Sequence, residues 1–146
     1  MVDVGWRQLR LSRDRLEKQA AHAADDGDEA TAGLLLFYAA ECGLKAELVK
    51  SVLRCRDTSG LPAHLRTHDL RELAKELGLP RTAQGGPDRC RRGNAPQWGA
   101  RSNGSRYVES PDLHQAWRYG ADLLPEDEKA ALAALTKLIR ECRERG

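Results

Sequence analysis

The chain has 146 residues, a formal net charge of +2 and 40% hydrophobic residues, which suits a single domain with one hydrophobic core. Alanine and leucine supply 41 residues, whereas the β-branched valine and isoleucine supply six. This balance favours helix over strand, so we predict one all-α domain over residues 1–146. No apolar run is long enough to span a membrane, and the first ten residues lack an apolar signal segment. We therefore expect a cytoplasmic protein.

The cysteine pattern argues against a metal or redox centre. The four cysteines are far apart and form no Cys-x-x-Cys pair: Cys42, Cys55, Cys90 and Cys142. Zinc sites and thioredoxin-like motifs need closely spaced thiols. We therefore expect small, mostly buried free thiols, three of them within helices, and neither a metal nor a cofactor.

Two long helices are predicted in the first part of the chain. Apolar residues recur at helical spacing from about Val4 to Ala24, and arginines and a lysine cover the rest of that surface. The polar residues Asp25–Asp28 then predict a chain reversal. The next helix, from about Glu29 to Arg56, is apolar around much of its circumference. We expect it to be roughly 40 Å long and central to the fold.

Three further helices are predicted after a loop. Asp69 and Glu72 have the spacing of an N-terminal cap, and Gly78 is suited to the C-terminal end of a short third helix. Ser110–Asp112 predicts the start of a fourth helix, and the acidic first turn that follows Pro125 predicts a fifth. The expected architecture is an antiparallel up-and-down bundle of four to five helices.

A long basic loop is expected between Pro80 and Tyr107. The segment holds five glycines, three prolines, six arginines and one acid, Asp88, so we predict an irregular connection. Its arginines are interspersed with Trp98 and Tyr107, a composition suited to phosphate contacts and base stacking. The predicted nucleic-acid-binding residues are Arg89, Arg91, Arg92 and Arg101.

Two motifs resemble the HEPN family (higher eukaryotes and prokaryotes nucleotide-binding domains). One is Tyr-Ala-Ala-Glu-Cys-Gly-Leu-Lys-Ala over residues 38–46, and the other is Thr-His-Asp-Leu-Arg-Glu-Leu over residues 67–73. The resemblance implies a helical bundle that is frequently a homodimer and that occurs in RNases, toxin-antitoxin modules and phage-defence systems. It also implies that active members cleave RNA without metal through an Arg-x4-6-His motif at a dimer cleft.

The Arg-x4-6-His motif is displaced in this chain. The strict match, Arg15 to His22, lies in the first helix, and the late pair Arg106 to His114 has seven residues between its members. We therefore expect a dimeric module that binds RNA or a separately encoded antitoxin or defence protein. The alternative is a metal-free endoribonuclease in which Arg106 supplies the cation and His114 the acid or base, both outside the core.

Glu41 and His68 also have a structural interpretation that is independent of the family. Glu41 and Lys45 are four residues apart on the most apolar helix, so their charges need partners. We expect Glu41 to accept a hydrogen bond from His68 or from free backbone N–H groups at the start of the third helix. Asp69 is expected to cap that helix, and His22 and His64 to be surface residues.

Overall fold

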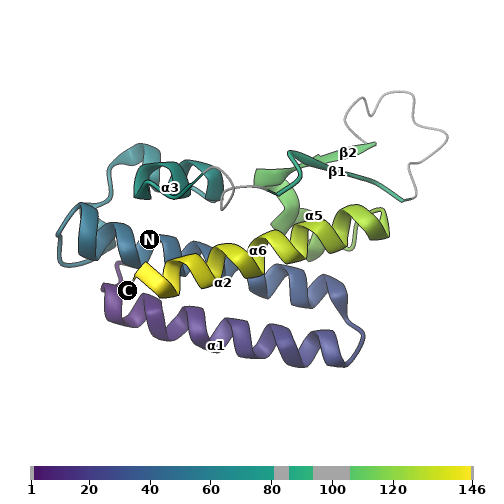
Figure 1. The fold of residues 1–146 in the computed structure, drawn as a ribbon, viewed down its shortest axis with the longest axis horizontal. Coiled ribbons are helices and arrows are strands. Elements are labelled where there is room, and N and C mark those ends of the chain that lie inside the picture. Colours follow the sequence, from purple (N-terminus) through teal and green to yellow (C-terminus); the bar gives the residue numbers. More distant parts are fainter. Residues whose placement is uncertain (1, 81–85, 94–105, 146) are drawn as a thin grey trace.

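The computed structural model describes residues 2–80, 86–93 and 106–145. Helices dominate these residues, which confirms the all-α class, and a two-stranded antiparallel sheet accompanies them (Figure 1). The helices are α1 (Trp6–Asp25), α2 (Glu29–Glu47), α3 (Leu70–Leu77), α5 (Leu113–Tyr119) and α6 (Pro125–Arg145), and the strands are β1 (Arg89–Arg91) and β2 (Tyr107–Glu109). None of the described helices is long and apolar enough to cross a bilayer.

Helix α2 is the centre of the core, as its composition predicts. Four helices, α1, α3, α5 and α6, pack against it. Its fully buried apolar side chains are Phe37, Ala39, Ala40, Leu44 and Ala46. The apolar circumference of this helix is therefore covered largely within the chain.

The helix directions differ from a strict up-and-down order. α1 and α2 are antiparallel and are joined by a short turn (Figure 1). α2 and α6 run parallel instead. Their first turns lie close together, since Glu29 near the start of α2 interacts with Glu128 near the start of α6. Gly43, near the end of α2, likewise lies against Cys142, near the end of α6. The chain between α2 and α6 travels back along the molecule, which allows this parallel pair.

The long second helix is shorter than predicted. α2 ends at Glu47 and continues as a single π-helical turn, Leu48–Val52. Arg54 then adopts a left-handed conformation with φ of 50°, which ends the helical path before Arg56. Cys55 consequently lies outside a helix. The fourth helix is also shorter, because Gly120 takes a left-handed conformation directly after Tyr119.

Charged residues are buried where α1 meets α2, contrary to the prediction that the α1 arginines lie on the surface. Glu47 is 1% exposed, and Arg10 donates two hydrogen bonds to its carboxylate, at 3.0 and 2.8 Å. Arg13 is also buried, and its Nε donates to Asp14 at 2.9 Å. A bidentate pair of this kind compensates the burial of the carboxylate and fixes the register of the two helices.

The two strands make part of the basic segment regular, whereas the sequence predicted an irregular loop. Arg89 pairs with Glu109, and Arg91 pairs with Tyr107. The hairpin also docks on the residues before α6, since the Leu124 N–H donates to the Arg91 carbonyl at 2.7 Å. This docking positions β1 and β2 beside α5.

The substitution Gly33→Ala tests how closely α5 packs against α2. A Cβ at this position would lie 2.4 to 2.8 Å from atoms of the Trp117 ring. Alanine is favoured over glycine in a helix by about 1 kcal/mol, so without this contact Gly33→Ala would stabilise the protein. We expect it instead to lower the free energy of unfolding by about 1 to 3 kcal/mol, because the ring must move. Urea denaturation measures the difference.

Gly43→Ala provides the comparison for this experiment. The nearest neighbours of its added Cβ would be the flexible Arg13 Cδ at 3.1 Å and Cys142 Cβ at 3.3 Å. We expect a smaller loss than at Gly33, because the arginine side chain can shift. Higher stability of Gly33→Ala would contradict the close approach of α2 and α5.

Candidate functional site

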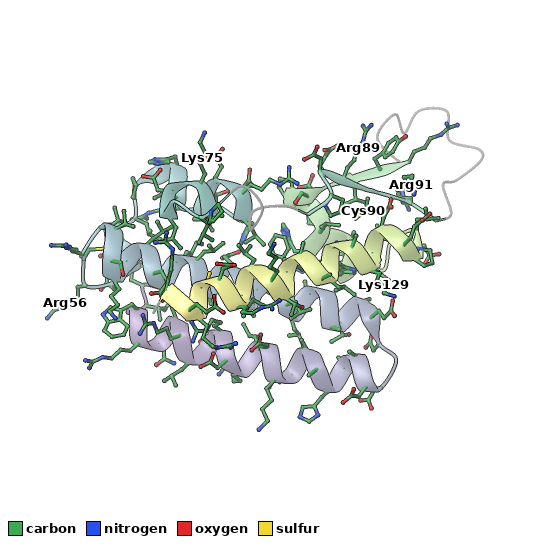
Figure 2. All side chains as sticks on the ribbon, in the orientation of Figure 1. Arg56, Lys75, Arg89, Cys90, Arg91 and Lys129 are labelled. Carbon is green, nitrogen blue, oxygen red and sulfur yellow. The ribbon has the colours of Figure 1, made fainter. Side chains whose placement is uncertain are left out.

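A cleft of about 540 Å³ lies between the β hairpin and α5. Its lining residues come from both sides: the basic Arg89 and Arg92 and the aromatic Tyr107 from the hairpin segment, and the neutral Gln115 and the aromatic Tyr119 from α5. Glu109 and Asp112 also line it. Figure 2 shows Arg89 on the hairpin, at the opposite end of the molecule from Arg56.

The side chains in this cleft are suited to hold a planar anionic ligand. The guanidinium of Arg89 lies over the Tyr107 ring, 4.1 Å from its centroid. The Nε atom of Arg92 is buried and has no hydrogen-bond partner among the described residues. Tyr119 is 76% exposed at the edge of the cleft. Exposed aromatic rings beside arginines can stack bases and contact phosphates.

The predicted nucleic-acid-binding arginines have different environments. Arg91 forms ion pairs with Asp127 at 3.0 Å and Glu126 at 3.1 Å, both in the first turn of α6. The hydrogen bond from Arg91 also lowers the pKa of the Asp127 carboxyl. Arg91 therefore attaches the hairpin to α6, whereas Arg89 and Arg92 line the cleft. Arg101 lies outside the described residues.

The predicted catalytic pair is not joined by any contact in the part of the chain that the structure describes. Arg106 is exposed, and its backbone carbonyl accepts a hydrogen bond from the Arg92 N–H at 2.8 Å. His114 is buried, at 7% exposure, contrary to the prediction that it lies outside the core. Its position on α5 turns it toward α2, and its ring lies 4.9 Å from that of Phe37.

His114 belongs to a different cluster, formed by residues of α2, of α5 and of the segment just before α3. The ring centroids of His114 and His68 are 5.0 Å apart, and Tyr38 is 6.3 Å from His114. Burial lowers the pKa of His114, and the neighbouring imidazole of His68 lowers it further. The Nδ1 atom of His114 is buried and has no well-formed hydrogen bond in the described structure. The nearby Pro111 backbone has a smaller effect of opposite sign and raises the pKa of His114.

The predicted link between Glu41 and His68 is confirmed. The Nδ1 atom of His68 lies 2.6 Å from one carboxylate oxygen of Glu41, and Lys45 donates to the other at 3.0 Å. Asp69 caps α3, as expected, by accepting from the Arg71 N–H. The carboxylate thus links the middle of α2 to the start of α3. The His68 side chain is 58% exposed, so its ring also faces solvent.

Sequence reasoning missed Arg118 and the proximity of the two imidazoles. Arg118 lies over the Tyr38 ring at 5.9 Å and donates a hydrogen bond to the Tyr38 hydroxyl. Tyr119 and Tyr38 both raise the pKa of this guanidinium. The spacing of four residues between His114 and Arg118 places both on one side of α5. This spacing is the one sequence signal that could have pointed to Arg118. The proximity of the two imidazoles has no such signal, because His68 and His114 are far apart in sequence.

Other candidate groups in the structure have structural explanations. Burial raises the pKa of Cys90 to about 11 and that of Cys142 to about 12, so neither thiol is an effective nucleophile. His22 and His64 are exposed, as predicted. Among the described residues no three metal-ligating side chains are grouped to hold an ion.

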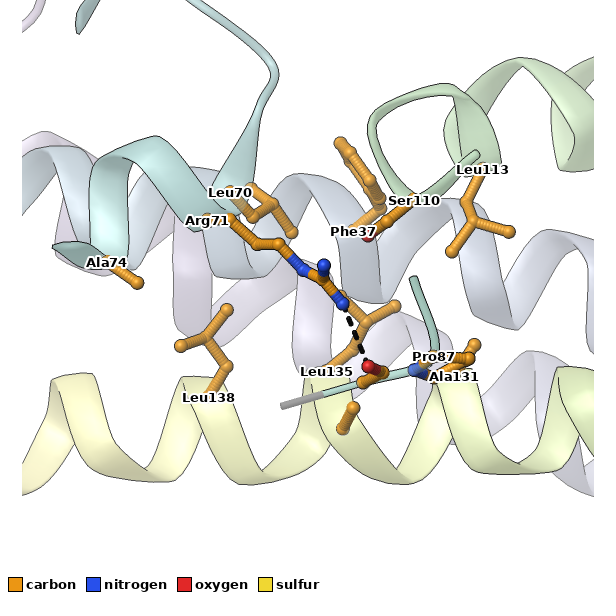
Figure 3. Close-up of a pocket in the computed structure, with 12 residues that line it drawn as sticks. Phe37, Leu70, Arg71, Ala74, Pro87, Ser110, Leu113, Ala131, Leu135 and Leu138 are labelled. Atoms are coloured by element: carbon orange, nitrogen blue, oxygen red, sulfur yellow. Dashed lines mark hydrogen bonds between the residues drawn. The ribbon is translucent and has the colours of Figure 1, made fainter. Parts of the chain in front are cut away.

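A small cavity of about 40 Å³ lies between α3, α5 and α6 and is mainly apolar (Figure 3). Arg71 extends into it and donates to the Gly86 carbonyl at 2.8 Å, the contact drawn as a dashed line in Figure 3. Arg71 also pairs with Asp88. These contacts attach residues 86–88 to α3 and thereby help to position the start of the hairpin.

Comparisons with family models, with curated proteins and with solved structures give no match to this chain.

The electrostatics of His114 can be tested by NMR titration. We expect a pKa below the ordinary value of 6.5. His68→Asn should raise this pKa, because it removes the second imidazole, and Glu41→Gln should lower it, because it removes a carboxylate that favours the charged form. Equal values in all three proteins would contradict the proximity of these groups.

The same shift has a consequence for stability. The unfolded chain binds a proton at His114 more readily than the folded chain does. Stability from this group is therefore present above about pH 6.5 and is lost as the pH falls toward the folded pKa. Thermal unfolding of the wild type and His114→Gln between pH 7.5 and pH 5 should show a weaker pH dependence in the variant.

Proposed function

We propose that this protein is a HEPN-like helical domain that binds single-stranded RNA in the cleft between the β hairpin and α5. The observation that supports this proposal best is the arrangement of Arg89 over Tyr107 beside the unpartnered Nε of Arg92. Arginines neutralise phosphates, and exposed tyrosine rings stack on bases. The exposed Tyr119 on the facing helix provides a second stacking surface.

The acidic residues of the cleft favour a strand over a compact multiply charged ligand. Glu109 and Asp112 lie in the same lining as the two arginines and would repel a concentrated negative charge. In a single strand the phosphates are spaced along the backbone and the bases are turned to one side. Such a ligand can contact the arginines with its phosphates and the tyrosines with its bases.

The alternative function is a metal-free endoribonuclease that uses Arg106 and His114. Arg106 is exposed, whereas His114 is buried against Phe37, and no contact joins them in the described residues. We therefore favour binding over cleavage by this pair. The setting that we propose is a bacterial toxin-antitoxin or phage-defence system in the cytoplasm, where the domain acts as a homodimer or with a separately encoded partner.

The exposed apolar side chains provide some support for a protein partner. Leu11 on α1 is 65% exposed and Val52 after α2 is 44% exposed. Both are distant in sequence from the hairpin cleft. Light scattering at several concentrations distinguishes self-association from dependence on a second protein.

RNA binding through the cleft predicts a specific mutational result. The double variant Arg89→Ala/Arg92→Ala should bind a fluorescent single-stranded RNA at least tenfold more weakly than the wild type. Its plot of log affinity against log salt should be less steep by roughly 1.4, because each phosphate contact in single strands contributes about 0.7. Fluorescence anisotropy at several salt concentrations measures both quantities.

The matched control is Arg56→Ala/Lys75→Ala, which removes two exposed cations far from the hairpin (Figure 2). We expect its affinity to remain within about twofold of the wild type, since its charges act only at long range. Equal losses in the two double variants would mean that net charge alone drives binding. Unchanged binding in Arg89→Ala/Arg92→Ala would place the RNA elsewhere.

A further inference from the structure

The carboxylate of Glu109 lies in the hairpin cleft without the partner that its position in the sheet provides. Glu109 is directly opposite Arg89 in the register of β1 and β2, and opposite charges on such cross-strand neighbours attract each other. In the part of the chain that the structure describes, no ion pair joins these two residues. The guanidinium of Arg89 lies over the Tyr107 ring instead, 4.1 Å from its centroid. Glu109 is exposed and lines the cleft, so its oxygens are available to a ligand.

The other acid of the cleft, Asp112, has a structural explanation. Asp112 directly precedes α5, where a negative charge stabilises the N-terminal end of a helix even without a cap hydrogen bond. Glu109 is at the end of a strand, where no such stabilisation exists. The fold therefore uses Asp112, whereas no contact of the Glu109 side chain among the described residues gives it a comparable role.

The dimensions of the cleft suit a single nucleotide of a strand. Its volume of about 540 Å³ is within the range of roughly 300–1,000 Å³ that is typical of small-molecule sites. Ala116 and Tyr119 are three residues apart, so both lie on the side of α5 that lines the cleft. The small Ala116 side chain leaves space for a flat group, and the exposed Tyr119 ring offers a stacking surface. One base can therefore lie between the hairpin and α5.

A carboxylate beside that base restricts which base fits. An ionised carboxylate accepts hydrogen bonds and donates none. Guanine presents two adjacent donors, N1–H and the N2 amino group, which match the two carboxylate oxygens as the fork of an arginine does. Adenine and cytosine each present one amino group beside an unprotonated ring nitrogen, and uracil presents one N–H between two carbonyl oxygens. Only guanine satisfies both oxygens without placing an acceptor against them.

We propose that the cleft selects a guanine in the bound strand and that Glu109 is the residue that selects it. This inference rests on the proposed binding of RNA in the cleft. Glu109 accepts from N1–H and from the N2 amino group, and Tyr119 stacks on the base. Arg89 and Arg92 contact the neighbouring phosphates. The arginines thus give affinity for any strand, whereas the carboxylate determines which base occupies the cleft.

The test measures the fluorescence anisotropy of labelled oligouridine strands that differ at one central nucleotide: guanosine, inosine, adenosine, cytidine or uridine. The full chain is used at one fixed salt concentration. The wild type should bind the guanosine strand on the order of tenfold more tightly than the uridine strand, because a bidentate contact to a base discriminates by about that factor. Inosine keeps N1–H and lacks the N2 amino group, so its strand should have an intermediate affinity.

Glu109→Gln should reduce the preference for guanosine to within about twofold, because the amide nitrogen places a donor against a donor of the base. Its affinity for the uridine strand should be equal or slightly higher, since a negative charge is removed. Asp112→Asn is the matched control. It removes the same charge from the same cleft, and it should keep the guanosine preference of the wild type. Both side chains are exposed, so the melting temperatures should change little.

The outcomes separate this inference from the proposed function. Equal binding of the guanosine and uridine strands by the wild type would refute guanine selection and leave RNA binding intact. A guanosine preference that survives Glu109→Gln, or that is lost in Asp112→Asn instead, would overturn the assignment to Glu109. Failure of the wild type to bind any of the strands would refute the proposed function itself.

Discussion

The close packing of α2 on nearly every side is the constraint on which the rest of the structure depends. Small residues make it possible, since Gly33 leaves room for the Trp117 ring and Gly43 for Arg13 and Cys142. Four helices can therefore approach one central helix closely, which maximises the burial of its apolar surface. Polar groups on α2 remain accessible only where the surrounding helices leave part of its surface uncovered.

That incomplete cover lies between α3 and α5, the two shortest helices. α3 has eight residues and α5 has seven, so neither extends along the whole of α2. Tyr38 and Glu41, which face this region, contact residues at the ends of the short helices rather than an apolar face. The location of the His68 cluster is thus a consequence of helix length, and the cluster in turn connects the two short helices through α2.

Sequence patterns predicted mainly those features that depend on neighbouring residues, and missed most of those that depend on tertiary contacts. The cap at Asp69 and the start of α6 at Pro125 follow from local spacing. The link from Glu41 to His68 joins residues 27 apart, and it was expected because a charge on an apolar helix needs a partner. The burial of Glu47 beside Arg10 could not be read from a helix whose neighbour was unknown. Likewise, His114 looks like a surface residue after a polar loop, and only its rotation toward Phe37 makes it part of the core.

The arginines of the hairpin segment show why a count of charges overestimates a binding surface. Arg91 and Arg92 are adjacent in the chain, but their side chains have different environments. Arg91, the last residue of β1, is neutralised by Asp127 and Glu126 in the acidic first turn of α6. Arg92, directly after β1, lines the cleft and has a buried nitrogen without a partner among the described residues. The hairpin segment thus uses one cation to fix its position on the helices, whereas the next cation lines the cleft.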